Sequence, residues 1–297
     1  MAPSGPYDQI QVNGASLAYR DMGRGEPLIL VHGHISDIRS WEPIQAKLAD
    51  RFRVIVYSRR YAWPNQEIGD QEGEDWLVHV DDLAAIIEKL NLGLAHVLGC
   101  SSGAYITILL AAKRPELVKM VLLEEPPAIS VFLPRLPPGI WDVLSLLIWH
   151  PFAFLPVMSF GATVIAPVIT AATKGNDDQV LGIFGPGALG RAVYDNLTPE
   201  RRQQVQDNKK WLCNFWRYSQ MPPLLEDEYR KIKAPLLMLT GARTIPSQRP
   251  IDSRVAALVP GGKEVIIPDA AHLIHEDNPD RVFEEVVAFV ETVKGSN

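Results

Sequence analysis

The sequence contains only two cysteines, Cys100 and Cys213, among its 297 residues. Two thiols are too few for a disulfide framework, so a reducing compartment is the simplest expectation. The chain also lacks any run of lysine or arginine, and its formal net charge is -6. An acidic chain without a basic patch argues against binding to nucleic acid, and we expect no such partner.

Targeting and cofactor motifs are absent from the sequence as well. The first residues carry neither a basic segment nor an apolar run, and the last three match no sorting signal. We therefore expect a cytoplasmic protein. There is no glycine-rich dinucleotide fingerprint, no phosphate-binding loop and no histidine or cysteine spacing typical of a metal site. We expect the protein to work without a cofactor or a metal ion.

Hydrophobic residues, by contrast, make up 47% of the chain, enough for one large α/β domain or for a core with a lid. Residues 143–173 contain no Asp, Glu, Lys or Arg. A bilayer span needs about 20 apolar residues, so this stretch is long enough to be one. Because Pro151, Pro156, Gly161 and Pro167 interrupt it, we expect two short helices over an apolar pocket and no stable membrane span. Peripheral membrane contact and a homodimer formed through this stretch remain open alternatives.

Apolar runs of strand length alternate with helical patterns over most of the chain, which predicts an open, mostly parallel sheet. Between residues 127 and 234 this alternation stops and several stretches are helical in pattern. A block of that length is far longer than an ordinary connection, so it predicts an inserted cap. We expect a core formed by residues 1–127 and 234–297, and a helical cap formed by residues 128–233. The expected strands include residues 27–31, 52–57, 95–98, 117–123, 235–240 and 263–267, after a hairpin around Asn13-Gly14.

The pentapeptide Gly99-Cys100-Ser101-Ser102-Gly103 fits the pattern G-x-S-x-G. In a nucleophile elbow, this pattern places a serine on a strained turn between a strand and a helix, with its hydroxyl exposed above the sheet. A strand pattern precedes this turn, and a helical pattern follows it at residues 104–112. Ser101 is therefore the candidate nucleophile. The alternative is an ordinary turn in which the serine caps the helix.

A serine hydroxyl attacks a carbonyl only when a base accepts its proton, and an acid must orient that base. Among the seven histidines, His272 is the best candidate for the base. It follows the last predicted strand and a short loop, which places it at the carboxyl edge of the sheet beside the elbow. His275 lies near the start of the last helix, where we expect it to face outward.

The acid has several candidates. One possible position for the acid is the loop after the strand at residues 235–240, but this loop offers only Thr244, which is not acidic. Asp252 comes eight residues later, within a predicted helix. The strand that follows the nucleophile helix ends with Glu124 and Glu125, and adjacent residues of a strand point to opposite sides. Only one of these two glutamates can therefore face His272.

The order of four motifs resembles the α/β-hydrolase fold. These are Val31-His32-Gly33-His34, the elbow at residues 99–103, Glu124-Glu125-Pro126-Pro127 and Ala270-Ala271-His272. The resemblance implies an α/β protein with a mostly parallel eight-stranded sheet, flanking helices and an inserted helical cap. Gly-Cys-Ser-Ser-Gly followed by Glu-Pro-Pro is similar to a cofactor-independent hydrolase group that includes the fungal zearalenone lactonases. In that group the acid is a glutamate after the sixth strand, which implies Glu125.

Acyl transfer also needs an oxyanion hole, in which two backbone N–H groups face the developing negative charge. One N–H should belong to Ser102, directly after the nucleophile. The family resemblance implies that the other belongs to His34. A small-molecule substrate of hydrophobic character would suit the aromatic cap, although packing within the protein explains each aromatic residue equally well. The candidate pocket residues are Gly33, Trp63, Trp141 and Trp211.

These patterns together predict a serine hydrolase that cleaves a carboxylic ester or lactone of a hydrophobic molecule through an acyl-enzyme, a chemistry that suits secondary metabolism. Two alternatives remain open. The same residues support hydrolysis of a C–C bond next to a carbonyl, and the fold also serves as a ligand-binding scaffold without catalysis.

Overall fold

The computed structural model describes residues 7–295, which form one eight-stranded sheet with helices on both faces. The strand order is β1-β2-β4-β3-β5-β6-β7-β8. β2 pairs antiparallel with β1 and β4, and all other neighbouring strands are parallel. The predicted mostly parallel sheet is therefore confirmed. The strands are β1 Asp8–Val12, β2 Ala15–Met22, β3 Pro27–Val31, β4 Arg53–Tyr57, β5 Ala95–Cys100, β6 Val118–Glu124, β7 Leu236–Gly241 and β8 Lys263–Ile267.

The predicted hairpin at Asn13-Gly14 joins β1 to β2. Asn13 has φ 44° and Gly14 has φ 76°. Two successive positive φ angles are what a tight hairpin turn requires, and asparagine followed by glycine adopts them at little cost.

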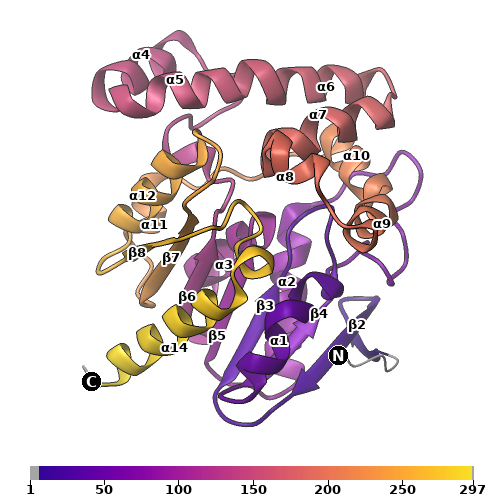
Figure 1. The fold of residues 1–297 in the computed structure, drawn as a ribbon, viewed down its shortest axis with the longest axis vertical. Helices are drawn as coiled ribbons and strands as arrows, with labels where there is room; N and C mark the ends of the chain where they lie inside the picture. The colour runs from indigo at the N-terminus through magenta and orange to yellow at the C-terminus, as the bar shows by residue number, and fades with distance from the viewer. Residues whose placement is uncertain (1–6, 296–297) are drawn as a thin grey trace.

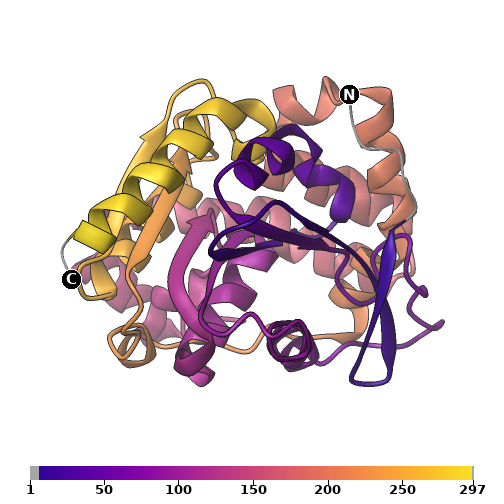
Figure 2. The same cartoon turned by 90° about the horizontal axis from the view of Figure 1, so that it is seen from below.

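The strands from β3 to β7 are buried on both faces, so their side chains divide between two cores. Along β3, Leu28 and Leu30 belong to one core, whereas Ile29 and Val31 belong to the other. This alternation follows from the two-residue period of a strand. Figure 2 shows α1 and α14 together over one face of the sheet, where they pack against each other. The core helices are α1 Glu42–Ala49, α2 Trp76–Lys89, α3 Ser102–Lys113, α12 Gln248–Leu258, α13 Ile274–Asp277 and α14 Pro279–Gly295, and short 3-10 turns cover Ile38–Trp41, Pro115–Leu117 and Ile129–Val131.

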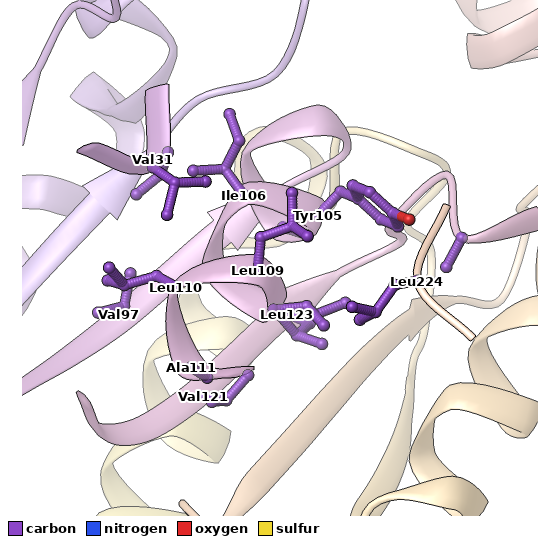
Figure 3. Packing of buried hydrophobic residues seen from close by; sticks show 14 of the residues in the cluster. Val31, Val97, Tyr105, Ile106, Leu109, Leu110, Ala111, Val121, Leu123 and Leu224 are labelled. Carbon is purple, nitrogen blue, oxygen red and sulfur yellow. The ribbon is translucent and has the colours of Figure 1, made fainter. Parts of the chain in front are cut away.

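Helix α3 lies over the centre of the sheet on the other face. Figure 3 shows Ile106, Leu109 and Leu110 of this helix packed with Val97 of β5 and Val121 of β6. Nearly every side chain of α3 is buried. The packing fixes the N-terminus of the helix, and therefore the residue that precedes it, above the ends of β5 and β6.

Between β6 and β7 the chain forms a run of helices that lies over the carboxyl ends of the strands, which we call the cap (Figure 1). Gly190, with φ 86°, separates two of these helices, and Asn208 separates two more. The cap helices are α4 Ile140–Trp149, α5 Pro151–Phe160, α6 Ala166–Thr173, α7 Asp177–Leu189, α8 Arg191–Asp195, α9 Pro199–Asp207, α10 Lys209–Tyr218 and α11 Glu226–Tyr229.

Pro151 interrupts the apolar stretch of the cap as expected, because α4 ends at Trp149 and α5 begins at Pro151. The expectation is wrong for Pro156, Gly161 and Pro167. α5 and α6 form one helix of 23 residues, Pro151–Thr173, which Figure 1 shows as a single rod along the outer edge of the cap. A π turn, Gly161–Ile165, joins them, with the Ala166 N–H bonded to the Gly161 carbonyl. This wider turn precedes Pro167, so the helix accommodates the proline without ending. The rod also does not cover a pocket as expected, because most of it faces outward.

Candidate active site

Ser101 occupies a strained turn between β5 and α3. Its backbone angles are φ 53° and ψ -122°, which are unfavourable for a residue with a side chain. Such strain persists only where neighbouring structure enforces it. The Ser101 N–H donates to the Glu124 carbonyl at 2.7 Å, and the Ser101 carbonyl accepts the Tyr105 N–H at 3.1 Å. The turn is therefore held on both sides, as the elbow pattern predicts.

Two glycines allow the loop after β3 to lie against this turn. A Cβ atom on Gly103 would be 2.1 Å from the Val31 carbonyl oxygen, so no other residue fits there. A Cβ atom on Gly33 would be 3.0 Å from the Ser101 Cβ and 3.6 Å from its Oγ. The chain between β3 and α1 therefore passes directly beside the candidate nucleophile.

The two N–H groups predicted for the oxyanion hole belong to the segments that these glycines bring together. Ser102 is the first residue of α3, and N–H groups in the first turn of a helix have no partner within the helix. The same helix end carries a partial positive charge, which favours an anion. His34 follows Gly33, and the next residue, Ile35, has φ 49°, a second strained position at the site. Arg201 of α9 holds this strained segment, because its Nη1 donates to the Ile35 carbonyl at 2.8 Å.

His272 and Glu125 form a buried pair beside the turn. The Nδ1 atom of His272 lies 2.8 Å from Oε2 of Glu125. The same carboxylate accepts hydrogen bonds from the Gly241 N–H at 2.8 Å and from the Thr244 hydroxyl at 2.7 Å. Three donors fix the position of the carboxylate, and a histidine held through Nδ1 presents Nε2 for proton transfer.

Among the candidates for the acid, the structure thus places Glu125 on His272. Thr244, which stands where many relatives of this fold would carry the acid, instead donates to Glu125. Asp252 is bonded to Thr240 and Gln248 rather than to the histidine. Burial, reinforced by the nearby charge of Glu125, raises the pKa of Asp252 well above its usual value. Asp252 is therefore held away from His272, in surroundings that disfavour its charged form.

Glu124 faces the opposite side of the sheet from Glu125 and pairs with His275. Oε2 of Glu124 lies 2.5 Å from Nδ1 of His275, and the imidazole stacks on Trp41 at 3.9 Å between ring centres. The expectation that His275 faces outward is wrong, because this side chain is 1% exposed. The short helix α13 turns the residue inward, and an ion pair makes its burial tolerable. Burial lowers the pKa of His275, but the charge and hydrogen bond of Glu124 outweigh it, and the net pKa is raised.

The His34 side chain is buried where the cap meets the core. Its ring stacks on Phe215 of α10 at 4.8 Å and lies equally close to Trp211. Its Nε2 is 3.6 Å from Oε1 of Glu74, which is too long for a hydrogen bond. Burial, with a smaller contribution from the positive charge of Arg59, lowers the pKa of His34 to about 4. The imidazole is therefore neutral at pH 7.

Ser101 and His272 line the same enclosed cavity. The core contributes Gly33, His34 and Ile35, among other residues, and the cap closes the cavity with Phe184, Ala188, Leu189 and Arg201. The cavity volume is about 20 Å³, which is room for about one water molecule. A larger hollow of about 640 Å³ beside α4 includes neither Ser101 nor His272.

Of the predicted pocket residues, only Gly33 lines this cavity. Trp141 is 75% exposed on the outer side of α4, so it is no part of the pocket. Trp63 instead lies under the guanidinium of Arg39. Trp211 is buried but stands behind His34, with its indole N–H bonded to Glu74. Sequence reasoning missed Phe184 and Leu189, because nothing in a helical pattern indicates which face of a cap helix meets the core.

Among residues 7–295, one group of side chains has the composition of a metal site. The ligand atoms of Cys100, Glu124 and His275 lie within 4.8 Å of one another. Glu124 and His275 are already hydrogen-bonded, and burial raises the pKa of the Cys100 thiol well above its usual value. A protonated thiol is a poor metal ligand, so this group is better described as packing behind the elbow.

A strained serine on a strand-to-helix turn, with a histidine and an acid at the carboxyl edge of a mostly parallel sheet, defines the α/β-hydrolase class. The model of the Alpha/beta hydrolase family matches residues 28–285, and the chain belongs to this family. A relative from Mycobacterium tuberculosis, named non-heme bromoperoxidase BpoC, is 28% identical and covers 94% of this chain and 99% of its own.

Two solved structures place the fold among hydrolases. An esterase from Thermogutta terrifontis has a TM-score of 0.74 at 22% identity, covering 97% of this chain and 99% of its own. The enol-lactonase of Burkholderia xenovorans has a TM-score of 0.64 at 20% identity, covering 96% of this chain and 100% of its own. Both likenesses show that the chain shares the fold of these proteins. The narrower resemblance to the zearalenone lactonases is not confirmed.

The depressed pKa of His34 predicts that acid destabilises the fold. Between about pH 6.5 and pH 4 the unfolded chain binds a proton at this residue that the folded chain does not bind. The free energy of unfolding should therefore fall as the pH falls through this window, by about 3 kcal/mol for this one group. His34→Phe, which keeps the stacking on Phe215, should show a shallower loss. Urea unfolding of both proteins at pH 7 and pH 4.5 measures the difference, and equal losses would contradict the assignment.

Proposed function

We propose that this protein is a serine hydrolase that cleaves a carboxylic ester or lactone through an acyl-enzyme. Ser101 is the nucleophile, His272 the base and Glu125 the acid that orients it. The observation that carries this proposal is the 2.8 Å contact of Glu125 with His272, whose imidazole lines the same cavity as Ser101.

The proposed reaction follows from the roles of these groups. Ser101 Oγ attacks the carbonyl carbon and gives its proton to Nε2 of His272, while Glu125 stabilises the resulting imidazolium. The N–H groups of His34 and Ser102 hold the oxygen of the tetrahedral intermediate. Collapse breaks the C–O bond, and His272 returns the proton to the leaving oxygen. A water molecule, deprotonated by His272, then attacks the acyl-enzyme and releases the acid and free Ser101.

A fluorophosphonate probe tests this assignment, because it forms a stable bond only with an activated serine. We expect stoichiometric labelling at Ser101 and turnover of short p-nitrophenyl esters. A protein that binds ligands without catalysis would give neither result. Labelling without ester turnover would favour the alternative of C–C bond hydrolysis, which product analysis of a β-diketone substrate would identify.

Substrate size should depend on the cap residues that close the cavity. Phe184 of α7 lies in the cavity wall and contacts Trp216. Phe184→Ala should widen the cavity and raise kcat/KM for bulky esters relative to acetate esters by about 10-fold, since a pocket change of this size is worth roughly 1–3 kcal/mol. A series of p-nitrophenyl esters of increasing acyl size measures the ratio. Phe160→Ala, at the end of α5, is the matched control, and the same ratio in both variants would rule out Phe184 as the limiting residue.

The preference for a lactone over an open ester is a finer proposal. It rests on the similarity of Gly-Cys-Ser-Ser-Gly and Glu-Pro-Pro to the motifs of the zearalenone lactonases. Comparison of macrolactones with open-chain esters of equal length measures it.

A further inference from the structure

The cap carries a long helix that is apolar around most of its circumference. It has 23 residues, Pro151–Thr173; its most apolar stretch of 18 residues has a mean hydropathy of 2.0, and only 22% of that stretch is buried. The core helix of a soluble protein would be mostly buried, so the usual explanation for such composition does not apply. The buried residues form a narrow stripe made of Ala153, Val157, Val164, Val168, Ala171 and Ala172.

Large apolar side chains are exposed together on this side of the cap. Eight of the thirteen large hydrophobic residues that are exposed among residues 7–295 lie on α4, α5 and α6. Phe152 is 95% exposed, and Trp149 is 74% exposed. Isolated exposed residues of this kind are common, but a contiguous group marks an interaction surface. We call this group the cap face: Ile140, Trp141, Leu147, Ile148, Trp149, Phe152, Leu155 and Ile169.

The threonine hydroxyls of the same helix are hydrogen-bonded within the helix. The hydroxyl of Thr163 donates to the Ser159 carbonyl at 2.8 Å, and that of Thr170 donates to the Ala166 carbonyl at 2.8 Å. These threonines are on the exposed surface, yet their hydrogen bonds are made within the helix. No charged side chain occurs anywhere in residues 143–173. The surface is therefore suited to a surrounding that offers neither hydrogen bonds nor charges.

We propose that the cap face binds the surface of a phospholipid bilayer, with the helix Pro151–Thr173 lying in the plane of the membrane. Lipid is favoured over a second copy of the chain because residues 143–173 offer no charged side chain that could fix one protein partner in place, whereas lipid needs none. Trp141 and Trp149 suit this position as well, since an indole combines an apolar ring with one N–H and prefers the membrane interface.

The packing of the rod determines its orientation. α6 packs against α7 and α10, and α5 packs against α4 and α12. A transmembrane orientation would require the helix to leave these neighbours, whereas an in-plane orientation leaves them in contact. The absence of charge on the cap face, in a chain of net charge -6, also indicates that burial of apolar area rather than attraction to anionic lipids drives binding.

Flotation with vesicles of pure phosphatidylcholine tests the proposal, because these vesicles offer no net charge. We expect the wild-type protein to float with the vesicles without detergent. The double variant Trp149→Glu with Phe152→Glu should lower the bound fraction by at least about 10-fold, since it removes two large apolar side chains from lipid. Leu94→Glu is the matched control and should bind like the wild type, because Leu94 is 51% exposed and directly precedes β5, at the end of the strand opposite the cap.

Circular dichroism, together with turnover of a water-soluble ester, checks that each variant is folded. Failure of the wild type to float, or equal flotation of the double variant, would overturn the proposal. Sedimentation velocity without lipid distinguishes lipid binding from a contact between two copies of this chain. A stable dimer that the double variant dissociates would assign the cap face to a contact between two copies of this chain, and would overturn the lipid assignment.

Discussion

Ser101→Ala is expected to reduce kcat on a p-nitrophenyl ester by about 10⁴-fold or more, leaving only the contribution of the oxyanion hole and substrate binding. The variant removes one hydroxyl from a turn whose backbone is held by hydrogen bonds to Glu124 and Tyr105, so the fold should be unchanged. Steady-state kinetics measure the loss, and a melting temperature equal to that of the wild type confirms the fold.

Ser36, a second serine in the wall of the same cavity, provides the control. Ser36→Ala should retain both turnover and fluorophosphonate labelling, whereas Ser101→Ala should lose both. Wild-type kcat in the Ser101 variant would disprove the proposed function. Turnover would then have to come from a group other than the Ser101 hydroxyl.

Glu125→Gln should reduce kcat by roughly 10²- to 10⁴-fold. The amide keeps the shape of the carboxylate but not the charge that stabilises the imidazolium of His272. Its NH₂ group also cannot accept a hydrogen bond, so the amide cannot keep both the bond from Gly241 and the bond from Thr244.

Asp252→Asn is the matched control, because it replaces a buried acid near Glu125 by its amide. Asp252 is bonded to Thr240 and Gln248 rather than to His272, so kcat should stay within a few-fold of wild type. The reverse pattern, with a large loss at Asp252 and near-normal kcat in Glu125→Gln, would transfer the role of the acid to Asp252.

The sequence predicted those parts of the fold that depend on local pattern. Two-residue alternation and apolar runs identified the strands, and Asn13-Gly14 identified the hairpin, because each reflects the preferences of a few adjacent residues. The proximity of Ser101, His272 and Glu125 followed from topology, since parallel strands bring their carboxyl ends to one edge.

Predictions that depended on tertiary contacts were less successful. His275 was expected outside, but its partner Glu124 lies 151 residues away, and no local pattern encodes that pairing. Trp141 looks like a pocket residue by its chemistry and is in fact on the outer surface. Pro156 and Pro167 were expected to break a helix, but the helix continues past both. A π turn precedes Pro167, and composition alone does not predict such a turn.

Because the cap and the core are separate stretches of the chain, changes in the cap can occur without changes at the proposed catalytic residues. Ser101 and Glu125 both precede the cap, at the ends of the adjacent strands β5 and β6, and the whole cap is inserted between β6 and β7. A longer, shorter or exchanged cap therefore alters neither residue, nor the helix and strand that connect them. Substrate range can diverge rapidly in one stretch of the gene while the proposed catalytic residues stay fixed in another.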